Sequence, residues 1–331
     1  MKIASYLKNS KQHLGINVQG KLYNIASLGG NFPSDVLAFL DEGETAMQSL
    51  QTKNQQLING EIKALPENDF HLLAPVPHPR SCRDGYAFRQ HVASARRNRG
   101  IEMIKEFDQY PIFYFTNHQA IQGPGDIFCM PDHFEQLDFE LEVAIVIGKE
   151  GKNIQAKNAD AHIAGFTIMN DMSARKLQME EMLLNLGPAK GKDFSTVIGP
   201  WLVTPDELKP FLVAPKDGHT GNNYNLSMKC WVNDQLVSEG NMADMDWTFA
   251  EIIERCSYGV TLYPGDVIGS GTVGTGCFLE LNGTAKLNNP QFQPQWLKEG
   301  DVVKMMIDGL GTLENTIRAE QTDWSILALK K

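Results

Sequence analysis

The sequence predicts a strand-rich α+β protein with a small N-terminal α+β domain followed by a larger domain. Its 331 residues suggest about two domains at roughly 150 residues each. Beyond residue 80, short apolar runs bounded by Gly, Pro, Asn or Asp are frequent, which is typical of strands. Helical stretches are few and do not alternate with these strands, so a doubly wound parallel sheet is disfavoured.

Residues 1–75 are expected to form the small domain. Lys2–Leu7 and Gly15–Ile25 alternate apolar and polar residues, with Gln19-Gly20 as a turn, which predicts strands. A helix is expected to begin at Asp35, and a second, polar helix to cover Glu42–Ile58. Three prolines follow: Pro75, Pro77 and Pro79. Because proline keeps the preceding residue out of the helical region, we expect an extended connection there and a second domain over residues 76–331.

The second domain is expected to contain six short strands and three helices. The predicted strands are Glu140–Gly148, Ala164–Asn170, Leu226–Val232, Asp266–Gly269, Phe278–Asn282 and Asp301–Ile307. The predicted helices are Arg89–Lys105, Ala174–Leu186 and Thr248–Arg255. Ser173 is expected to cap the second of these helices, since serine is a preferred N-cap residue.

Composition narrows the possible functions. The formal net charge of −10, from 30 Lys and Arg against 40 Asp and Glu, disfavours binding to nucleic acid or to an anionic membrane. The apolar run Val143–Ile147 is far shorter than the roughly 20 residues that span a bilayer. Five cysteines without C-x-x-C spacing argue against a disulfide framework and a structural zinc site. We therefore expect a cytoplasmic protein.

One glycine motif matches a known binding pattern but lacks its context. Gly269-Ser-Gly271-Thr-Val-Gly274 has the G-x-G-x-x-G spacing of dinucleotide-binding loops. Such a loop must lead into a helix, whose N-terminus faces the pyrophosphate. The next residues, Cys277–Leu281, are predicted to form a strand, so dinucleotide binding is disfavoured.

Alternating acids form the most informative segment. Asp138, Glu140 and Glu142 are two residues apart, so on a strand they share one face at spacings of about 7 Å. Ala144 and Val146 continue that face, which indicates a strand buried on both sides. Buried carboxylates repel one another and require protons or a cation, and hard cations take oxygen ligands. The alternative is a solvated face of an edge strand.

Two further acids and a histidine could join this cluster. Asp171 follows a predicted strand, where an acid is also common in turns. Asp84 and His91 lie within the segment Asp84-Gly-Tyr86-Ala-Phe-Arg89-Gln90-His91. A single histidine is more often structural than catalytic, so only its combination with the acids indicates a site.

Six motifs occur in a fixed order along the chain. They are D-x-Y-x-x-R-Q-H (Asp84 to His91), E-x-E (Glu140, Glu142), N-D-x-S-A-R-x-x-Q (Asn170 to Gln178), Gly191-Lys192-Asp-Phe194, Gly269-Ser-Gly271-Thr272 and Phe278-Leu-Glu280-Leu. Together, over about residues 78–310, they resemble the fumarylacetoacetate hydrolase family. The resemblance implies a mixed β-roll or sandwich catalytic domain (residues 76–331) and a homodimer.

The resemblance also implies roles for individual residues. A divalent metal, Mg²⁺, Ca²⁺ or Mn²⁺, would be held by four carboxylates: Asp84, Glu140, Glu142 and Asp171. His91 and Glu280 would activate water. The groups that stabilise developing negative charge would be Arg175, Gln178 and Lys192. Tyr86 and Thr272 would contact the substrate. Asp138 is outside this pattern, and we expect it behind the ligands or at the surface.

The expected function is metal-dependent hydrolysis of a C–C bond in a ketonic acid of the β-diketo or acylpyruvate type, such as fumarylacetoacetate or fumarylpyruvate, as in aromatic amino acid catabolism. One alternative is decarboxylation of a 2-oxo diacid, or isomerisation or hydration of a 2-hydroxydienoate, on the same site. Another is a non-catalytic, metal-stabilised binding protein. Met182 stands where fumarylacetoacetate-cleaving members have a tyrosine, which counts against fumarylacetoacetate itself. The expected partner is a small-molecule acid, with neither nucleic acid nor membrane.

Overall fold

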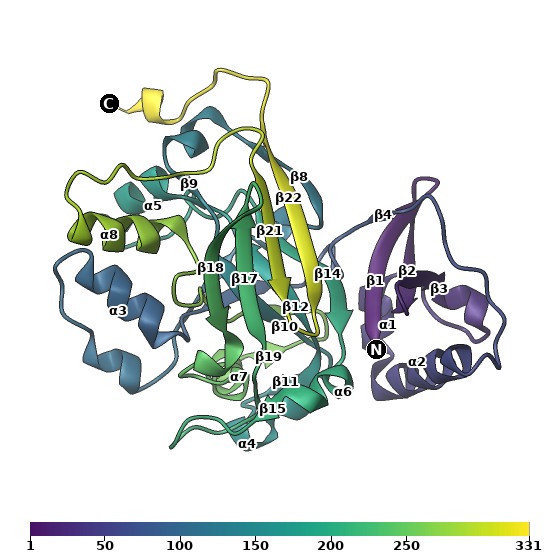
Figure 1. The fold of residues 1–331 in the computed structure, drawn as a ribbon. Coiled ribbons are helices and arrows are strands. Elements are labelled where there is room, and N and C mark those ends of the chain that lie inside the picture. The colour runs from purple at the N-terminus through teal and green to yellow at the C-terminus, as the bar shows by residue number, and fades with distance from the viewer. Residues whose placement is uncertain (331) are drawn as a thin grey trace.

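The computed structural model describes residues 1–330, in which an N-terminal part lies beside a larger strand-rich body (Figure 1). The N-terminal part contributes β1 (Lys2–Lys8), β2 (Lys11–Val18), β3 (Lys21–Asn24), β4 (His71–Leu72), α1 (Val36–Asp41) and α2 (Gly43–Ile58). As expected, the Asp35 side chain caps α1 by accepting hydrogen bonds from the N–H groups of Leu37 and Ala38. The predicted strands and helices of this part are therefore confirmed.

The first sheet runs through both parts of the molecule. Its other strands are β5 (Cys82–Gly85), β6 (Phe113–Thr116), β7 (Ile121–Gln122), β10 (Leu141–Ile147), β12 (Ile163–Asp171), β14 (Thr196–Val203) and β20 (Val267–Gly269). The strand order is β3-β2-β1-β14-β12-β10-β20-β5-β6, with β4 beside β1 and β7 beside β14. β1 joins the body by antiparallel pairing with β14, where Ile3 lies opposite Leu202. Residues 1–75 and 76–331 thus share one sheet, and their division into two domains stays a prediction.

Strand β10 is buried on both faces, as the alternation of its residues predicts. Val143 and Ile145 pack into the main apolar cluster of the body. Ala144 and Val146 point the other way, into a cluster that includes residues of β1, β2, α1 and α2. This face of the strand that carries Glu142 therefore belongs to an apolar cluster that the N-terminal part and the body share.

A second sheet packs against the upper face of the first. Its order is β18 (Gln235–Asn241), β17 (Ser227–Val232), β21 (Val302–Ile307), β22 (Gly311–Ala319) and β8 (Gly125–Cys129). Met228 and Met305 from this sheet share the main apolar cluster with Val143 and Ile168 from the first. Figure 1 shows β17, β18, β21 and β22 lying across β10 and β12. The predicted strand-rich α+β fold with packed sheets is confirmed.

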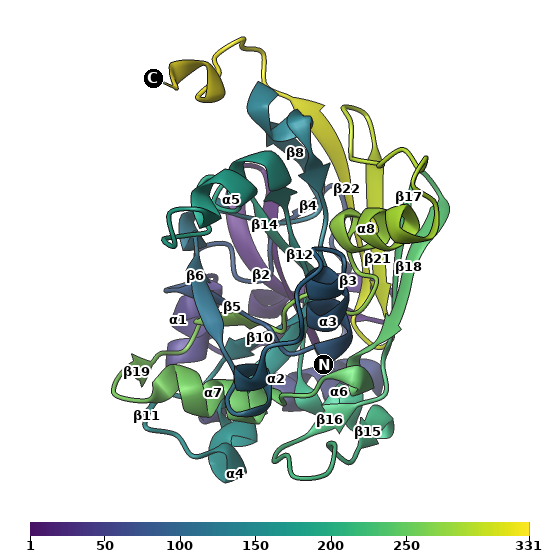
Figure 2. The same ribbon diagram turned by 90° about the vertical axis from the view of Figure 1, so that its left-hand side faces the viewer.

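Short elements complete the body. The helices are α3 (Arg89–Arg97), α4 (Ala156–Ala159), α5 (Arg175–Met182), α6 (Pro205–Leu208), α7 (Phe249–Ser257) and α8 (Phe278–Asn288). The remaining strands are β9 (Leu137–Asp138), β11 (Gly151–Lys152), β13 (Ser173–Ala174), β15 (Leu212–Val213), β16 (Asn223–Tyr224) and β19 (Thr261–Leu262). α3 and α8 pack side by side at one end of the body (Figure 2). None of the helices in residues 1–330 is long and apolar enough to cross a membrane.

The helix predicted over Arg89–Lys105 ends at Arg97, eight residues early. Two further sequence predictions are wrong. Phe278–Asn282 begins helix α8 instead of forming a strand, because three apolar residues in a five-residue segment fit either period. The glycine loop at Gly269–Gly274 is therefore followed by a helix after all. The first N–H groups of that helix are already occupied, since those of Phe278 and Leu279 donate to Asp138 at 2.7 and 2.9 Å. The second wrong prediction concerns Ser173, which caps no helix. It lies in β13, and its hydroxyl donates a hydrogen bond to the Asp171 carbonyl oxygen.

Candidate metal centre and active site

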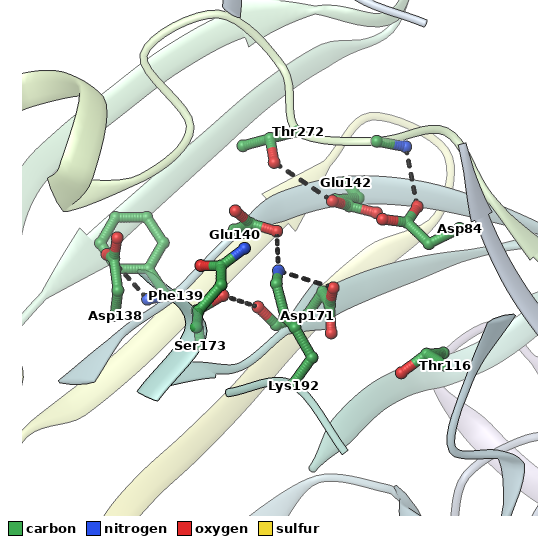
Figure 3. Close-up of polar contacts among 12 residues, drawn as sticks. Asp84, Thr116, Asp138, Phe139, Glu140, Glu142, Asp171, Ser173, Lys192 and Thr272 are labelled. Atoms are coloured by element: carbon green, nitrogen blue, oxygen red, sulfur yellow. Dashed lines mark hydrogen bonds and ion pairs between the residues drawn. The ribbon is translucent and has the colours of Figure 1, made fainter. Parts of the chain in front are cut away.

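Three buried carboxylates meet where β5, β10 and β20 lie side by side (Figure 3). Asp84 belongs to β5, Glu142 to β10, and Glu140 directly precedes β10. One oxygen atom from each of the three lies within 4.8 Å of the others. A Cβ at Gly269 of β20 would lie only 2.4 Å from Oδ1 of Asp84, so the glycine leaves the space that this carboxylate occupies.

Burial disfavours the ionised form of two of these carboxyl groups, Asp84 and Glu142. Burial, with the nearby charge of Asp84, raises the pKa of Glu142 well above its usual range. Burial and the charge of Asp171 raise the pKa of Asp84 to about 7. Oε1 of Glu142 accepts a hydrogen bond from the Thr272 hydroxyl at 3.3 Å, whereas its Oε2 is buried without a partner. This unpartnered oxygen in an oxygen-rich cluster fits a hard divalent cation.

Glu140 is instead surrounded by positive charge. Its Oε1 accepts a hydrogen bond from Arg175 at 2.7 Å, and its Oε2 contacts the Lys192 ammonium group. Burial opposes ionisation of Glu140, but Lys192 and Arg175 outweigh it and lower the pKa of Glu140 to about 2. Glu140 is therefore the carboxylate of the three that stays charged whether or not a cation is bound.

Asp171, the fourth expected ligand, is coupled to Lys192. Its Oδ2 accepts hydrogen bonds from Lys192 at 2.8 Å and from the Tyr114 hydroxyl at 2.5 Å. Figure 3 shows Lys192 bridging Asp171 and Glu140. Asp171 is not part of the three-carboxylate group found within the described residues. The structure thus brings three of the expected ligands together and links the fourth to them through an ammonium group.

Arg175 is fixed by an acid whose position the sequence did not reveal. Nε of Arg175 donates to Oδ2 of Asp138 at 2.9 Å, and its Nη1 donates to Gln178 at 3.0 Å. Asp138 has no exposed surface, so it lies behind the ligands and not at the surface. It also accepts the N–H groups that begin α8, and therefore connects Arg175 to the helix that carries Glu280. Its place in the alternation with Glu140 was the only signal in the sequence.

His91 and Glu280 form a buried pair between α3 and α8. Nδ1 of His91 lies 2.8 Å from Oε2 of Glu280. The Tyr86 ring meets the imidazole edge-on, with 6.0 Å between ring centroids. Because Glu280 engages Nδ1, Nε2 is the ring nitrogen left to exchange a proton. This arrangement suits a general base.

A cavity of about 600 Å³ lies over these groups. Its polar lining includes eight expected site residues: Asp84, Tyr86, His91, Glu140, Arg175, Gln178, Lys192 and Thr272. Apolar residues form much of the rest: Ile112, Phe113, Met179, Met182, Leu279, Pro294 and Trp296. Tyr114, which no motif identified, also lines it and contacts Asp171. Arg175 and Lys192 therefore lie together in the lining of one cavity with the carboxylates Asp84 and Glu140.

The packed sheets and the cavity lined by buried carboxylates, Arg175 and Lys192 are the arrangement expected of an enzyme that acts on a small molecule. Residues 81–318 match the family model described as fumarylacetoacetate (FAA) hydrolase C-terminal. The chain therefore belongs to the fumarylacetoacetate hydrolase family.

Two curated relatives and two solved structures show the range of that family. The chain is 32% identical over 314 residues to the mitochondrial oxaloacetate tautomerase FAHD2B of Bos taurus, covering 92% of this chain and 87% of that one. It is 31% identical over 315 residues, with the same coverage, to the mitochondrial oxaloacetate tautomerase FAHD2A of Homo sapiens. The fold is similar to a fumarylacetoacetate hydrolase from psychrophilic Exiguobacterium antarcticum (TM-score 0.70, 24% identity, 97% and 100% coverage). It is also similar to maleylpyruvate hydrolase from Sphingobium sp. SYK-6 in complex with manganese(II) and pyruvate (TM-score 0.68, 22% identity, 97% and 100% coverage).

These names cover both tautomerases and hydrolases, so family membership leaves the reaction open. Because the two curated relatives are named as mitochondrial, they give no support to the expected cytoplasmic location, which stays a prediction. The expected homodimer likewise stays a prediction.

Proposed function

We propose that the protein is a divalent-metal-dependent enzyme that interconverts the keto and enol forms of a small 2-oxo diacid of the oxaloacetate type. The observation that carries this proposal is a single His91–Glu280 pair beside two fixed cations, Arg175 and Lys192, in one cavity. Enolisation moves one proton and develops one oxyanion, which such a set can accomplish. The names of the two curated relatives support the choice of substrate class.

Asp84, Glu140 and Glu142 would hold the metal, with Asp171 as a fourth carboxylate. Oxygen ligands suit Mg²⁺, Ca²⁺ or Mn²⁺, and the manganese in the maleylpyruvate hydrolase complex is consistent with that range. When bound, such an ion supplies Lewis acidity to the 2-oxo group of the substrate.

The protein's own groups would transfer the proton and hold the charge. His91 accepts a proton at Nε2 from the carbon next to the carbonyl, while Glu280 stabilises the imidazolium through Nδ1–H. The enolate oxygen then takes a proton from water in the cavity to complete the enol, and His91 releases its proton to water. In the reverse direction the enol hydroxyl loses its proton to water, and Nε2 of the protonated His91 delivers a proton to carbon. Arg175 and Lys192 hold positive charge near the substrate oxygens, and one such donor typically contributes about 10²–10³ in rate.

C–C bond hydrolysis of an acylpyruvate-type acid is the second candidate. The specific observation in its favour is again His91–Glu280, because a base held by a carboxylate can also deprotonate water. The cavity of about 600 Å³ is also larger than a four-carbon diacid fills, so it has room for a longer acyl chain.

The two candidates are separated by assaying the purified protein with Mg²⁺ and with Mn²⁺. Tautomerisation of enol oxaloacetate would be measured by the loss of its ultraviolet absorbance. Hydrolysis of acylpyruvates and fumarylpyruvate would be measured by the appearance of pyruvate. We expect acceleration of keto–enol exchange that His91→Ala lowers by about 10²–10⁴, the usual contribution of a general base. The matched control is His219→Ala, since His219 also pairs through Nδ1 with a glutamate, Glu251 at 3.0 Å, but lies outside the cavity lining. Pyruvate release without any acceleration of keto–enol exchange would establish the hydrolase instead.

A further inference from the structure

A second group of potential metal ligands shares Glu140 with the carboxylate centre but adds a sulfur and a nitrogen atom. Sγ of Cys277, a ring nitrogen of His91 and a carboxylate oxygen of Glu140 all lie within 4.8 Å of one another. Three atoms at that spacing have a common point about 2.8 Å from each of them. Zinc bonds to sulfur and nitrogen are about 2.3 and 2.0–2.1 Å, so modest side-chain shifts would complete a site.

We propose that Cys277, His91 and Glu140 bind a thiophilic divalent cation such as Zn²⁺ or Cd²⁺, and that this ion inhibits the enzyme by occupying the base. The inhibition rests on the proposed function of His91, whereas the binding does not. Sulfur, nitrogen and oxygen together favour a softer ion than the all-oxygen centre does. The two sites would therefore take different metals.

Each of the three ligands is placed for this role. Cys277 directly precedes α8, and its thiol is completely buried beside His91 and Glu140, so the thiolate would form as the metal binds. Two other buried cysteines, Cys129 and Cys230, direct Sγ to a backbone carbonyl oxygen, but Cys277 donates no hydrogen bond within residues 1–330.

His91 is oriented as a metal ligand is. Its Nδ1 is bonded to Glu280, which leaves Nε2 for the ion, and a carboxylate behind an imidazole is the usual arrangement around a zinc-binding histidine. His91 and Glu140 both line the cavity, so an ion can reach them from solvent. The thiol proton of Cys277 would leave to solvent by the same route as the thiolate binds the metal.

Charge balance leaves room for a second ion. Six buried carboxylates surround the two centres: Asp84, Asp138, Glu140, Glu142, Asp171 and Glu280. Two buried cations, Arg175 and Lys192, face them, which leaves an excess of four negative charges when all are ionised. One divalent ion at the carboxylate centre neutralises half of this excess, so a second divalent ion is electrostatically favoured.

The test is a titration of the Mg²⁺-saturated protein with CdCl₂. Three quantities would be measured: cadmium bound per chain by equilibrium dialysis, the ultraviolet sulfur-to-cadmium charge-transfer absorbance, and turnover relative to the cadmium-free rate of each variant. Cys277→Ser is compared with Cys256→Ser, the same change at a buried cysteine of α7 that belongs to neither ligand group.

We expect the wild type and Cys256→Ser to bind one cadmium with sulfur absorbance despite saturating Mg²⁺, and to lose turnover over the same concentration range. Cys277→Ser should lose the absorbance and need at least about tenfold more cadmium for inhibition, because even supporting residues contribute 10–100-fold to metal affinity. Equal absorbance in both serine variants, or complete displacement of cadmium by Mg²⁺, would overturn the proposal.

A second variant keeps the test decisive if Cys277→Ser does not fold. His91→Ala removes the nitrogen ligand, and we expect it to weaken cadmium binding about tenfold or more while Mg²⁺ binding stays unchanged. Unaltered cadmium affinity would refute the site. Dialysis and absorbance need no turnover, so failure of the proposed reaction can be told apart from failure of this site.

Discussion

Asp138→Ala should be among the most destabilising single substitutions in the site, although Asp138 contacts no expected metal position. Its carboxylate, with no exposed surface, accepts hydrogen bonds from Arg175 at 2.9 Å and from the N–H groups of Phe278 and Leu279. Removing one partner of a buried ion pair costs about 3–5 kcal/mol. Losing the acceptor at a helix start adds about 0.5–2 kcal/mol. We therefore expect the free energy of unfolding to fall by about 3.5–7 kcal/mol.

The measurement is equilibrium denaturation in urea, with Asp132→Ala as the control. Asp132 is also buried and accepts the N–H groups of Ile326 and Leu327, but no arginine or lysine bonds to it. The control should therefore lose only about 1–3 kcal/mol, the cost of leaving such donors unpaired. If Asp138→Ala loses no more than Asp132→Ala does, the ion pair with Arg175 does not stabilise the fold and the reasoning fails.

Three further predictions concern the charges of the site. Lys192→Ala should lower the rate of the chemical step by about 10²–10³ while metal binding, measured by calorimetry, persists, because an ammonium group cannot ligate a metal. Removing the divalent ion with a chelator should lower the melting temperature, since an ion at 100 times its Kd stabilises the folded state by about 2.7 kcal/mol. In the metal-free protein, the pKa of Asp84 in the folded state is about 7, above its usual value. The folded state therefore holds this proton more tightly than the unfolded state does, and the free energy of unfolding should fall as pH rises from about 4 to 7. Denaturation of metal-free wild type and Asp84→Asn at pH 5 and pH 8 checks this, and the variant should lose less stability over that interval.

The sequence predicts the local features of the fold better than the long-range ones. Alternation in Val143–Ile147 predicts a strand buried on both faces, and the structure shows it. The pairing of Ile3 with Leu202 could not be predicted, because nothing in either segment specifies a partner so distant along the chain. Phe278–Asn282 was assigned the wrong element because its apolar run is too short to distinguish a period of 2 from one of 3.6.

In the site, too, the sequence predicts local features better than contacts between distant segments. The acids Asp84, Glu140 and Glu142 are recognisable by their motifs, and the fold brings them together. The bridging of Glu140 and Asp171 by Lys192 depends on how the segment between α5 and β14 folds back, which no spacing reveals. The role of Asp138 depends on the first N–H groups of α8 pointing at its carboxylate, and this segment was not predicted as a helix.

The shared sheet also limits how this enzyme can be rearranged. Ala144 and Val146, on the strand that holds Glu142, belong to the same apolar cluster as Ile3 and Leu50 of the N-terminal part. A shortened chain that begins at residue 76 would expose part of this apolar cluster to water. It would also leave Leu202 and Val203 of β14 without their partner strand β1, and both kinds of surface promote aggregation. For protein engineering, residues 1–75 should therefore be kept with the body. A different scaffold for the candidate site would need apolar residues that bury the same face of the strand that carries Glu142.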